Sequence, residues 1–204
     1  MSNPAPLSLH LAGASHEDHS LRAKVGMGCF LVSEAVFFCT LIVAYITYLG
    51  IPMEGPTPDE VLDLKIPFAG TVFLLSSSLT IAGASMALSR GKGTVAAGWL
   101  AITAMLGVAF LVGTAIEWKE LIQVHRLTID RNLFGTTFFT LIGFHGAHVT
   151  MGVIIMSVMV WLLSSRRMHK GHAEGLELFS WYWHFVDVVW VAIFLIVYLV
   201  GRNA

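Results

Sequence analysis

The stretch Trp181-Tyr182-Trp183-His184-Phe185-Val186-Asp187-Val188-Val189-Trp190 decides how this chain is interpreted. It lies within an otherwise apolar segment, residues 178–200. About twenty helical residues at 1.5 Å per residue cross the ~30 Å hydrocarbon core of a bilayer. The segment is therefore predicted to be a membrane-spanning helix.

Two polar side chains, His184 and Asp187, fall near the middle of that span. A charge at this depth costs at least ~2.5–3.5 kcal/mol, so such a group normally faces protein and has a partner. Residues three apart on a helix share a face. We therefore expect His184 and Asp187 to satisfy each other, or to meet jointly a group on another helix.

The composition of the whole chain is that of a membrane protein. Hydrophobic residues make up 56% of the sequence and charged residues 12%, and the mean hydropathy is +0.75. The net charge of −1, without a large basic patch, gives no case for nucleic-acid binding. Five apolar segments are long enough to span a bilayer: 25–49, 66–88, 95–116, 133–163 and 178–200.

We predict an all-α fold, an integral membrane bundle of five transmembrane helices formed by residues 21–204. Residues 1–20 are polar and are expected to form a disordered, solvated tail. The proline- and glycine-rich residues 50–59 are predicted to be a loop, and residues 90–93 a tight turn.

The distribution of lysine and arginine predicts the orientation, because cytoplasmic loops are enriched in these residues. With the N-terminus inside and the C-terminus outside, the inner turns are short and almost purely basic. The inner set is Arg22, Lys24, Arg90, Lys92, Arg166, Arg167 and Lys170, and the outer set is Lys65, Lys119, Arg126, Arg131 and Arg202.

Small residues predict which helices are surrounded by others, since close approach drives helix packing in lipid. They are concentrated in segments 66–88 and 133–163, which we expect to lie between neighbours. Cys29 and Cys39 are ten residues apart in one helix, or ~15 Å, which is too far for a disulfide. We interpret both as core packing.

Three further titratable residues lie in the apolar segments. Glu34 falls near mid-membrane and is either a structural carboxyl or a proton-relay or ion-coupling group. His145 and His148 share a helix face and either bind metal or haem together with His184, or form interhelical hydrogen bonds with Glu34 or Asp187. No second helix supplies a matching histidine pair, which favours hydrogen bonding.

At the end of segment 95–116, Glu117-Trp118-Lys119-Glu120 is typical of interfacial anchoring, with Glu117 reaching back into the bundle as the alternative. The sequence has no nucleophile–base set, Walker loop, dinucleotide glycine pattern or CxxC motif. It therefore offers no independent catalytic site.

Three stretches together resemble one family. They are WYWHFVDVVW at residues 181–190, Val32-Ser33-Glu34-Ala35-Val36-Phe37-Phe38, and the run from Phe134-Gly135-Thr136-Thr137-Phe138-Phe139 to Gly143-Phe144-His145-Gly146-Ala147-His148-Val149. In this order they resemble subunit III of the haem-copper respiratory oxidases, the cytochrome c oxidase subunit III family in its short five-helix form. The resemblance covers residues 24–201.

This resemblance implies a non-catalytic subunit of a proton-pumping terminal oxidase of the bacterial plasma (inner) membrane. Haem and copper would be held by partner subunits. The main partner would be subunit I, followed by subunit II and other respiratory complex subunits, and the chain itself would bind phospholipid but no metal. Such a subunit supports assembly with subunit I, proton uptake and lasting turnover.

For individual residues, the resemblance favours a structural role for Glu34, in an interior cleft near bound lipid. The candidates for lipid contact are Arg166, Arg167 and Trp183, because the position where family members place a lipid-contacting arginine reads Trp161-Leu162-Leu163 here. We further expect Glu34, His145, His148, His184 and Asp187 to lie near one depth, as a polar layer rather than a proton wire.

Three alternatives stay open at the level of the sequence. The nearest is subunit III of a quinol oxidase, although the stretch at 181–190 is more similar to cytochrome c oxidases. A second, of another class, is a membrane proton or ion transporter that uses Glu34 and Asp187. The third is a haem-binding cytochrome.

Overall fold

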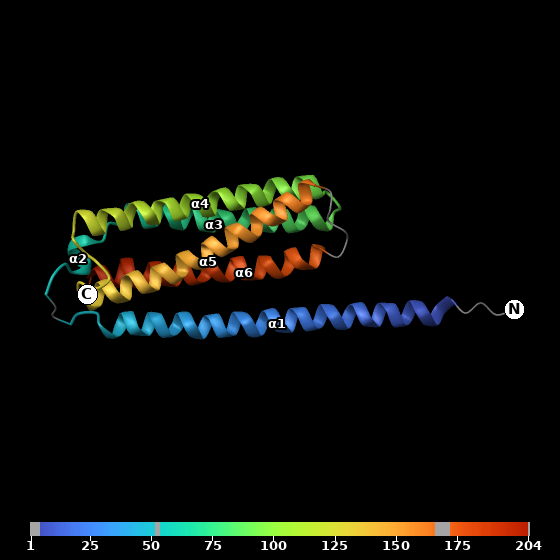
Figure 1. Ribbon diagram of the computed structural model, residues 1–204, viewed down its shortest axis with the longest axis horizontal. Coiled ribbons are helices and arrows are strands. Elements are labelled where there is room, and N and C mark those ends of the chain that lie inside the picture. The colour runs from blue at the N-terminus through green and yellow to red at the C-terminus, as the bar shows by residue number, and fades with distance from the viewer. Residues whose placement is uncertain (1–4, 52–53, 166–171, 204) are drawn as a thin grey trace.

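The computed structural model describes the backbone of residues 5–51, 54–165 and 172–203 (Figure 1). Side chains are described within these ranges from Ser20 onward, apart from residues 172, 173 and 203. This part of the chain is helical and contains no strand. Its elements are α1 (Ala5–Thr47), α2 (Pro58–Val61), α3 (Lys65–Ser89), α4 (Gly93–Gln123), α5 (Leu133–Ser164), α6 (His172–Ile193), the π-helix η1 (Phe194–Val200) and the 3-10 helix η2 (Gly201–Asn203).

Five helices of the described residues are long and apolar enough to cross a membrane, which confirms the predicted all-α bundle of five spans. The spans are Ser20–Thr47, Lys65–Ser89, Gly93–Gln123, Leu133–Ser164 and Glu174–Val200. Each predicted segment lies within or close to the corresponding span. The orientation of the two ends remains a prediction.

Helices α3 and α4 form an antiparallel pair, joined by a turn in which Gly91 takes a φ of 73°. A positive φ of this size is readily accessible to glycine, as the predicted tight turn requires. Helix α6 lies against α3, and α5 crosses the bundle in contact with α4 and α6 (Figure 1). Helix α1 packs on the other side, against α5 and α6.

The centre of the bundle is built around the fully buried Trp183 of α6. Gly107 of α4 and Gly152 of α5 both face its ring. A Cβ atom on Gly107 would come within 3.1 Å of the Trp183 ring, and one on Gly152 within 2.7 Å of its Cε3 atom. Glycine is therefore required where these helices approach the indole. Helix α3 contacts α4 and α6, and α5 contacts α1, α4 and α6, which confirms that segments 66–88 and 133–163 lie between neighbours.

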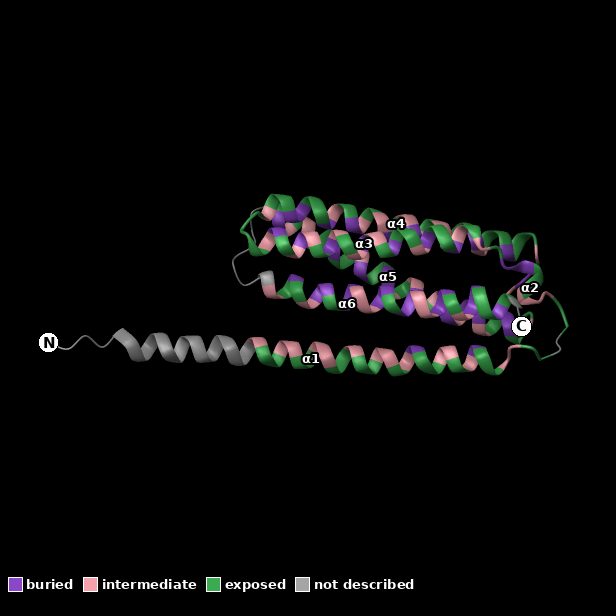
Figure 2. Ribbon diagram, turned by 180° about the vertical axis from the view of Figure 1, so that it is seen from behind, coloured by how far each residue is buried: buried purple, intermediate pink, exposed green. Residues whose placement is uncertain are grey.

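Helix α1 differs from the sequence expectation in two respects. Helix α1 begins at Ala5, so residues 5–20 continue the helix instead of forming a disordered tail. Cys29 and Cys39 are unpaired and exposed on α1, so they are not core residues as interpreted. Only one face of α1 contacts the rest of the bundle, and the described residues on its other faces are largely exposed (Figure 2).

The loop between α1 and α3 is attached to the start of α5 by Asn132. Its side-chain oxygen accepts a hydrogen bond from the backbone N–H of Gly135 at 2.8 Å, which caps the helix. The amide Nδ2 of the same residue donates to the carbonyl oxygen of Pro56 at 3.1 Å. One side chain thus fixes both the start of α5 and the loop beside it.

Candidate functional site

Glu34 of α1 and His148 of α5 form a polar pair in the interior of the membrane span. The Oε2 atom of Glu34 lies 3.1 Å from Nε2 of His148. The other ring nitrogen, Nδ1, donates to the carbonyl oxygen of Phe144 at 2.7 Å, because a carbonyl can only accept. One hydrogen bond thus joins the carboxyl of α1 to the imidazole of α5, and both side chains are partly buried.

His184 and Asp187 meet jointly on Ser78 of α3, which is the second of the two arrangements expected from their spacing. The Ser78 hydroxyl donates to Oδ2 of Asp187 at 2.5 Å. Its oxygen lies 2.9 Å from Nδ1 of His184. Since the single hydroxyl proton goes to Asp187, the imidazole N–H donates to the serine oxygen. This triad links α6 to α3.

His145 belongs to neither set. Its ring is 1% exposed and stacks on Trp190 with centroids 5.1 Å apart and an interplanar angle of 29°. The edge of Phe110 covers it from another side at 5.6 Å. Among the described residues, neither ring nitrogen has a hydrogen-bond partner. The five polar residues singled out from the sequence are therefore distributed as a pair, a serine-bridged pair and a single aromatic-packed histidine.

No group of three or more His, Cys, Asp or Glu side chains in the described part of the chain is placed to hold a metal ion. The three histidines singled out from the sequence have different partners: His148 contacts Glu34, His184 contacts Ser78, and His145 stacks on Trp190. The geometry gives no support to a shared metal or haem ligand set formed by these three residues.

A further buried polar contact joins Glu117 to Tyr198, and only the tyrosine partner was not predicted. The Tyr198 hydroxyl donates to Oε2 of Glu117 at 3.0 Å, and the carboxyl is 7% exposed. Glu117 thus reaches back into the bundle, which was the alternative to plain interfacial anchoring. Tyr198 lies in η1, where the widened π-helical turn sets its direction. The tyrosine partner therefore could not be found from α-helical spacing.

A groove of about 630 Å³ lies between α1, α5 and α6, beside the Glu34–His148 pair. Its walls are apolar apart from those two groups and the Tyr182 hydroxyl, which donates to the carbonyl oxygen of His148 at 2.9 Å. The lining residues are Met27, Phe30, Glu34, Ala147, His148, Met151, Ile155, Gly175, Leu178, Phe179 and Tyr182. A groove of this shape and chemistry suits a hydrocarbon chain.

The groove changes the list of residues expected to contact lipid. Trp183 is fully buried and its Nε1 donates to the hydroxyl oxygen of Ser77 at 2.8 Å, so it is a core residue with no surface for lipid. Arg166 and Arg167 lie outside the described residues. The lipid-facing candidates are instead the groove residues on α1, α5 and α6.

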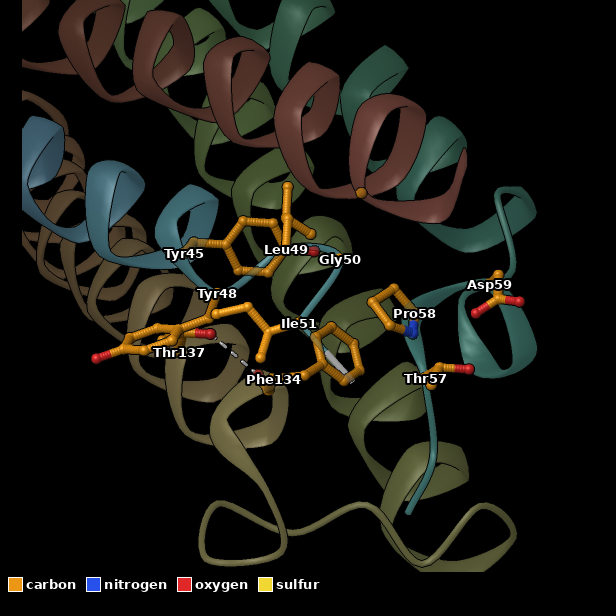
Figure 3. Close-up of a pocket in the computed structure, with 11 residues that line it drawn as sticks. Tyr45, Tyr48, Leu49, Gly50, Ile51, Thr57, Pro58, Asp59, Phe134 and Thr137 are labelled. Carbon is orange, nitrogen blue, oxygen red and sulfur yellow. Dashed lines mark hydrogen bonds between the residues drawn. The ribbon is translucent and has the colours of Figure 1, made fainter. Parts of the chain in front are cut away.

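Two further hollows lie at the other end of the bundle. One, of about 280 Å³, is lined by Tyr45, Tyr48, Pro58 and Phe134 (Figure 3), and the Tyr45 hydroxyl lies next to Gly201, which follows η1. The second, of about 310 Å³, is bordered by several carboxyl groups, including Asp63. The backbone N–H of Lys65 donates to Asp63 and lowers the pKa of that carboxyl.

The sequence model of the family described as cytochrome c oxidase subunit III matches residues 11–202. Cytochrome c oxidase subunit 3 of Bacillus subtilis is 36% identical over 194 residues, 92% of this chain and 92% of that protein. The Synechocystis protein of the same name is 35% identical over 193 residues, 90% of this chain and 78% of that protein. Cytochrome bo(3) ubiquinol oxidase subunit 3 of Pseudomonas putida is 32% identical over 184 residues, 90% of this chain and 88% of that protein.

Proposed function

The chain belongs to the cytochrome c oxidase subunit III family, and from this membership we propose that it is the non-catalytic subunit III of a proton-pumping terminal oxidase that reduces oxygen to water. It is an integral membrane protein of a bacterial membrane. Subunit I is its main partner and subunit II a further one, and these partners hold the haem and copper. The chain supports their assembly, proton uptake and lasting turnover.

The observation that carries this proposal is that the interior polar groups are divided among separate local contacts. Glu34 pairs with His148, and Asp187 accepts a hydrogen bond from Ser78. The two contacts are separate, and each joins two helices. The ring of His145 packs against the rings of Trp190 and Phe110. A proton or ion transporter needs a continuous series of polar groups across the bilayer, and these local pairs are better suited to holding helices together. The chain reconstituted alone is therefore expected to show no ion flux.

The groove beside Glu34 gives this supporting role a physical basis. We assign to it the acyl chain of a phospholipid, because its walls are largely apolar and it opens between helices that face the bilayer. A bound lipid would fill the space that α1 leaves against α5 and α6. It would thereby hold α1 in place while the neighbouring subunits turn over.

The test replaces the groove carboxyl by an amide in the reconstituted oxidase complex. Glu34→Gln keeps the size of the side chain and its ability to hydrogen-bond, but removes its titratable proton. Oxygen consumption and proton ejection in the first seconds are expected to stay close to those of the wild type, followed by a faster loss of activity. Ser33→Ala, next to Glu34 but exposed, is the matched control. An immediate loss of turnover in a fully assembled complex would contradict the supporting role.

A second candidate, subunit III of a quinol oxidase, is favoured by the similarity to the Pseudomonas putida protein. The two functions differ in the electron donor and not in the chemistry of this chain. Turnover of the purified complex with reduced cytochrome c and with a ubiquinol analogue, measured separately, decides between them. We expect cytochrome c to be the donor.

The orientation proposed is N-terminus inside and C-terminus outside. Reporter proteins fused after Ala204 and inserted in the α3–α4 turn at Gly91 are expected on opposite sides of the membrane, the first outside and the second inside. A cytoplasmic signal from the fusion after Ala204 would contradict this orientation.

A further inference from the structure

Next to the groove proposed to bind lipid lies an ion pair that has no role in the proposed function. Lys24 of α1 and Glu177 of α6 form an ion pair, with Nζ and Oε1 3.2 Å apart. Lys24 precedes the groove residue Met27 by three positions, and Glu177 adjoins the groove residue Leu178. Since residues three apart on a helix share a face, Lys24 lies one helical turn beyond Met27 on the groove side of α1, and we take the ion pair to mark the mouth of the groove.

The distance from the ion pair to the polar pair matches one leaflet of a bilayer. Ten residues of α1 separate Lys24 at the mouth from Glu34 at the polar pair. At 1.5 Å per residue this is ~15 Å, about half of the ~30 Å hydrocarbon core. An acyl chain that begins at the level of Lys24 therefore ends near the level of the Glu34–His148 pair. The groove thus holds a lipid of the leaflet at the Lys24 end, with its headgroup at the ion pair.

The Lys24–Glu177 ion pair can exchange partners at little cost in free energy. The side chains of Lys24 and Glu177 are 37% and 49% exposed, and exposed ion pairs contribute little to stability. An ammonium group is a good point-charge partner for phosphate. Lys24 can therefore turn from Glu177 to a lipid phosphate at little cost, provided that the carboxylate of Glu177 then finds another cation.

We propose that Lys24 and Glu177 together select a phospholipid with a primary amine in its headgroup, of the phosphatidylethanolamine class. The phosphate pairs with Lys24 and the ammonium group pairs with Glu177, so both charges of the protein pair and both charges of the headgroup are satisfied. An anionic headgroup without an amine, such as phosphatidylglycerol, gains the contact to Lys24 but leaves Glu177 facing a negative charge. This selection rests on the proposed lipid binding in the groove.

The experiment uses the purified oxidase complex, stripped of lipid by detergent and reloaded with phosphatidylethanolamine or phosphatidylglycerol that carry identical acyl chains. Lipid retained on the complex is measured by native mass spectrometry. The wild type is expected to retain phosphatidylethanolamine in preference. Glu177→Gln is expected to lower the ratio of phosphatidylethanolamine to phosphatidylglycerol by about threefold to fivefold. Lys24→Gln is expected to lower retention of both lipids.

Two control variants separate this proposal from the broader function. Arg22→Gln removes an exposed cation two residues from Lys24, on another face of α1, and is expected to leave both retention values unchanged. Gly175→Leu adds a side chain where a Cβ atom meets nothing within 4 Å, and narrows the groove. It is expected to displace one lipid whatever its headgroup.

The outcomes distinguish headgroup selection from lipid binding. An unchanged lipid ratio in Glu177→Gln, with one lipid lost in Gly175→Leu, overturns the headgroup assignment and leaves lipid binding in the groove intact. No lipid lost in Gly175→Leu overturns both. Equal effects of Arg22→Gln and Lys24→Gln would mean that general surface charge, and not the groove mouth, attracts the lipid.

Discussion

Helices α6 and α1 are both membrane spans of similar hydropathy, yet they are held in different ways. In the most apolar part of α6, 44% of the residues are buried, against 11% in α1. Helix α6 is fixed by close contact between an indole and two glycines, and by hydrogen bonds to α3. Helix α1 leaves a groove against its neighbours. Mean hydropathy therefore identifies a span but does not tell how firmly it is packed.

The largest effect is expected where the packing around α6 is tightest. Gly152→Ala should prevent normal packing of α5 on α6, because the added Cβ overlaps the buried ring of Trp183. Overpacking of this kind costs ~3 kcal/mol when the ring has no space to move. The yield of assembled complex and its thermal dissociation temperature measure the effect. Gly146→Ala on the same helix, where a Cβ meets nothing within 4 Å, should behave as wild type; equal loss in both variants would contradict this account.

A smaller but clear effect is expected from the polar link of α6. Asp187→Leu removes the acceptor of the Ser78 hydroxyl and leaves His184 with an altered partner. An unsatisfied group at low dielectric costs ~1–3 kcal/mol, so assembly with subunit I should be impaired. The measurement is the fraction of complex that retains this chain after purification. If that fraction is normal and only turnover changes, Asp187 handles protons rather than holding the helix.

On the groove side, the loss of one hydrogen bond should be tolerated better. Tyr182→Phe removes the bond from the phenol to the carbonyl oxygen of His148. The expected destabilisation is ~0.5–1.5 kcal/mol, typical of a single neutral hydrogen bond. Thermal dissociation of the complex should fall by less than for Asp187→Leu. An equal or larger fall would show that α5 and α6 depend on this hydrogen bond more than a single neutral bond should contribute.

The smallest effect is expected on the outer face of α1. Cys29→Ser and Cys39→Ser change exposed, unpaired side chains, and surface substitutions away from special features usually stay within ±0.5 kcal/mol. Assembly and thermal stability of the complex should therefore match the wild type. A loss of assembly in either variant would identify that position as part of a contact with another subunit.

The sequence alone predicted the elements better than their partners. Five spans follow from runs of apolar residues, and Glu34, His148 and Asp187 could be singled out because each is polar at a depth where water is scarce. Their partners depend on how the helices are rotated against one another, which small-residue patterns define only coarsely. Ser78 illustrates the limit, since one serine among several on α3 gives no signal that it faces α6.

The exposed cysteines and the Glu117–Tyr198 bond show two further limits. An apolar residue of a membrane span can face either lipid or protein. Hydropathy therefore could not predict that Cys29 and Cys39 face outward. The partner of Glu117 depends on a π-helical turn in η1, which no periodicity in the sequence indicates. Both failures concern the direction of a side chain and not the existence of its helix.

The π-helix η1 has a consequence for how this chain tolerates changes in length. A π-helical turn holds one residue more than an α-helical turn, and here it closes with a bond from the N–H of Gly201 to the carbonyl oxygen of Ile196. Deleting one residue between Phe194 and Val197 would let the segment relax to an α-helix without moving the span as a whole. Tyr198 would keep nearly the same direction toward Glu117, because the deletion removes only the extra residue of the wide turn. A one-residue deletion at this point would therefore be tolerated, whereas the same deletion in an α-helical part of α6 would turn every residue after it by roughly 100°.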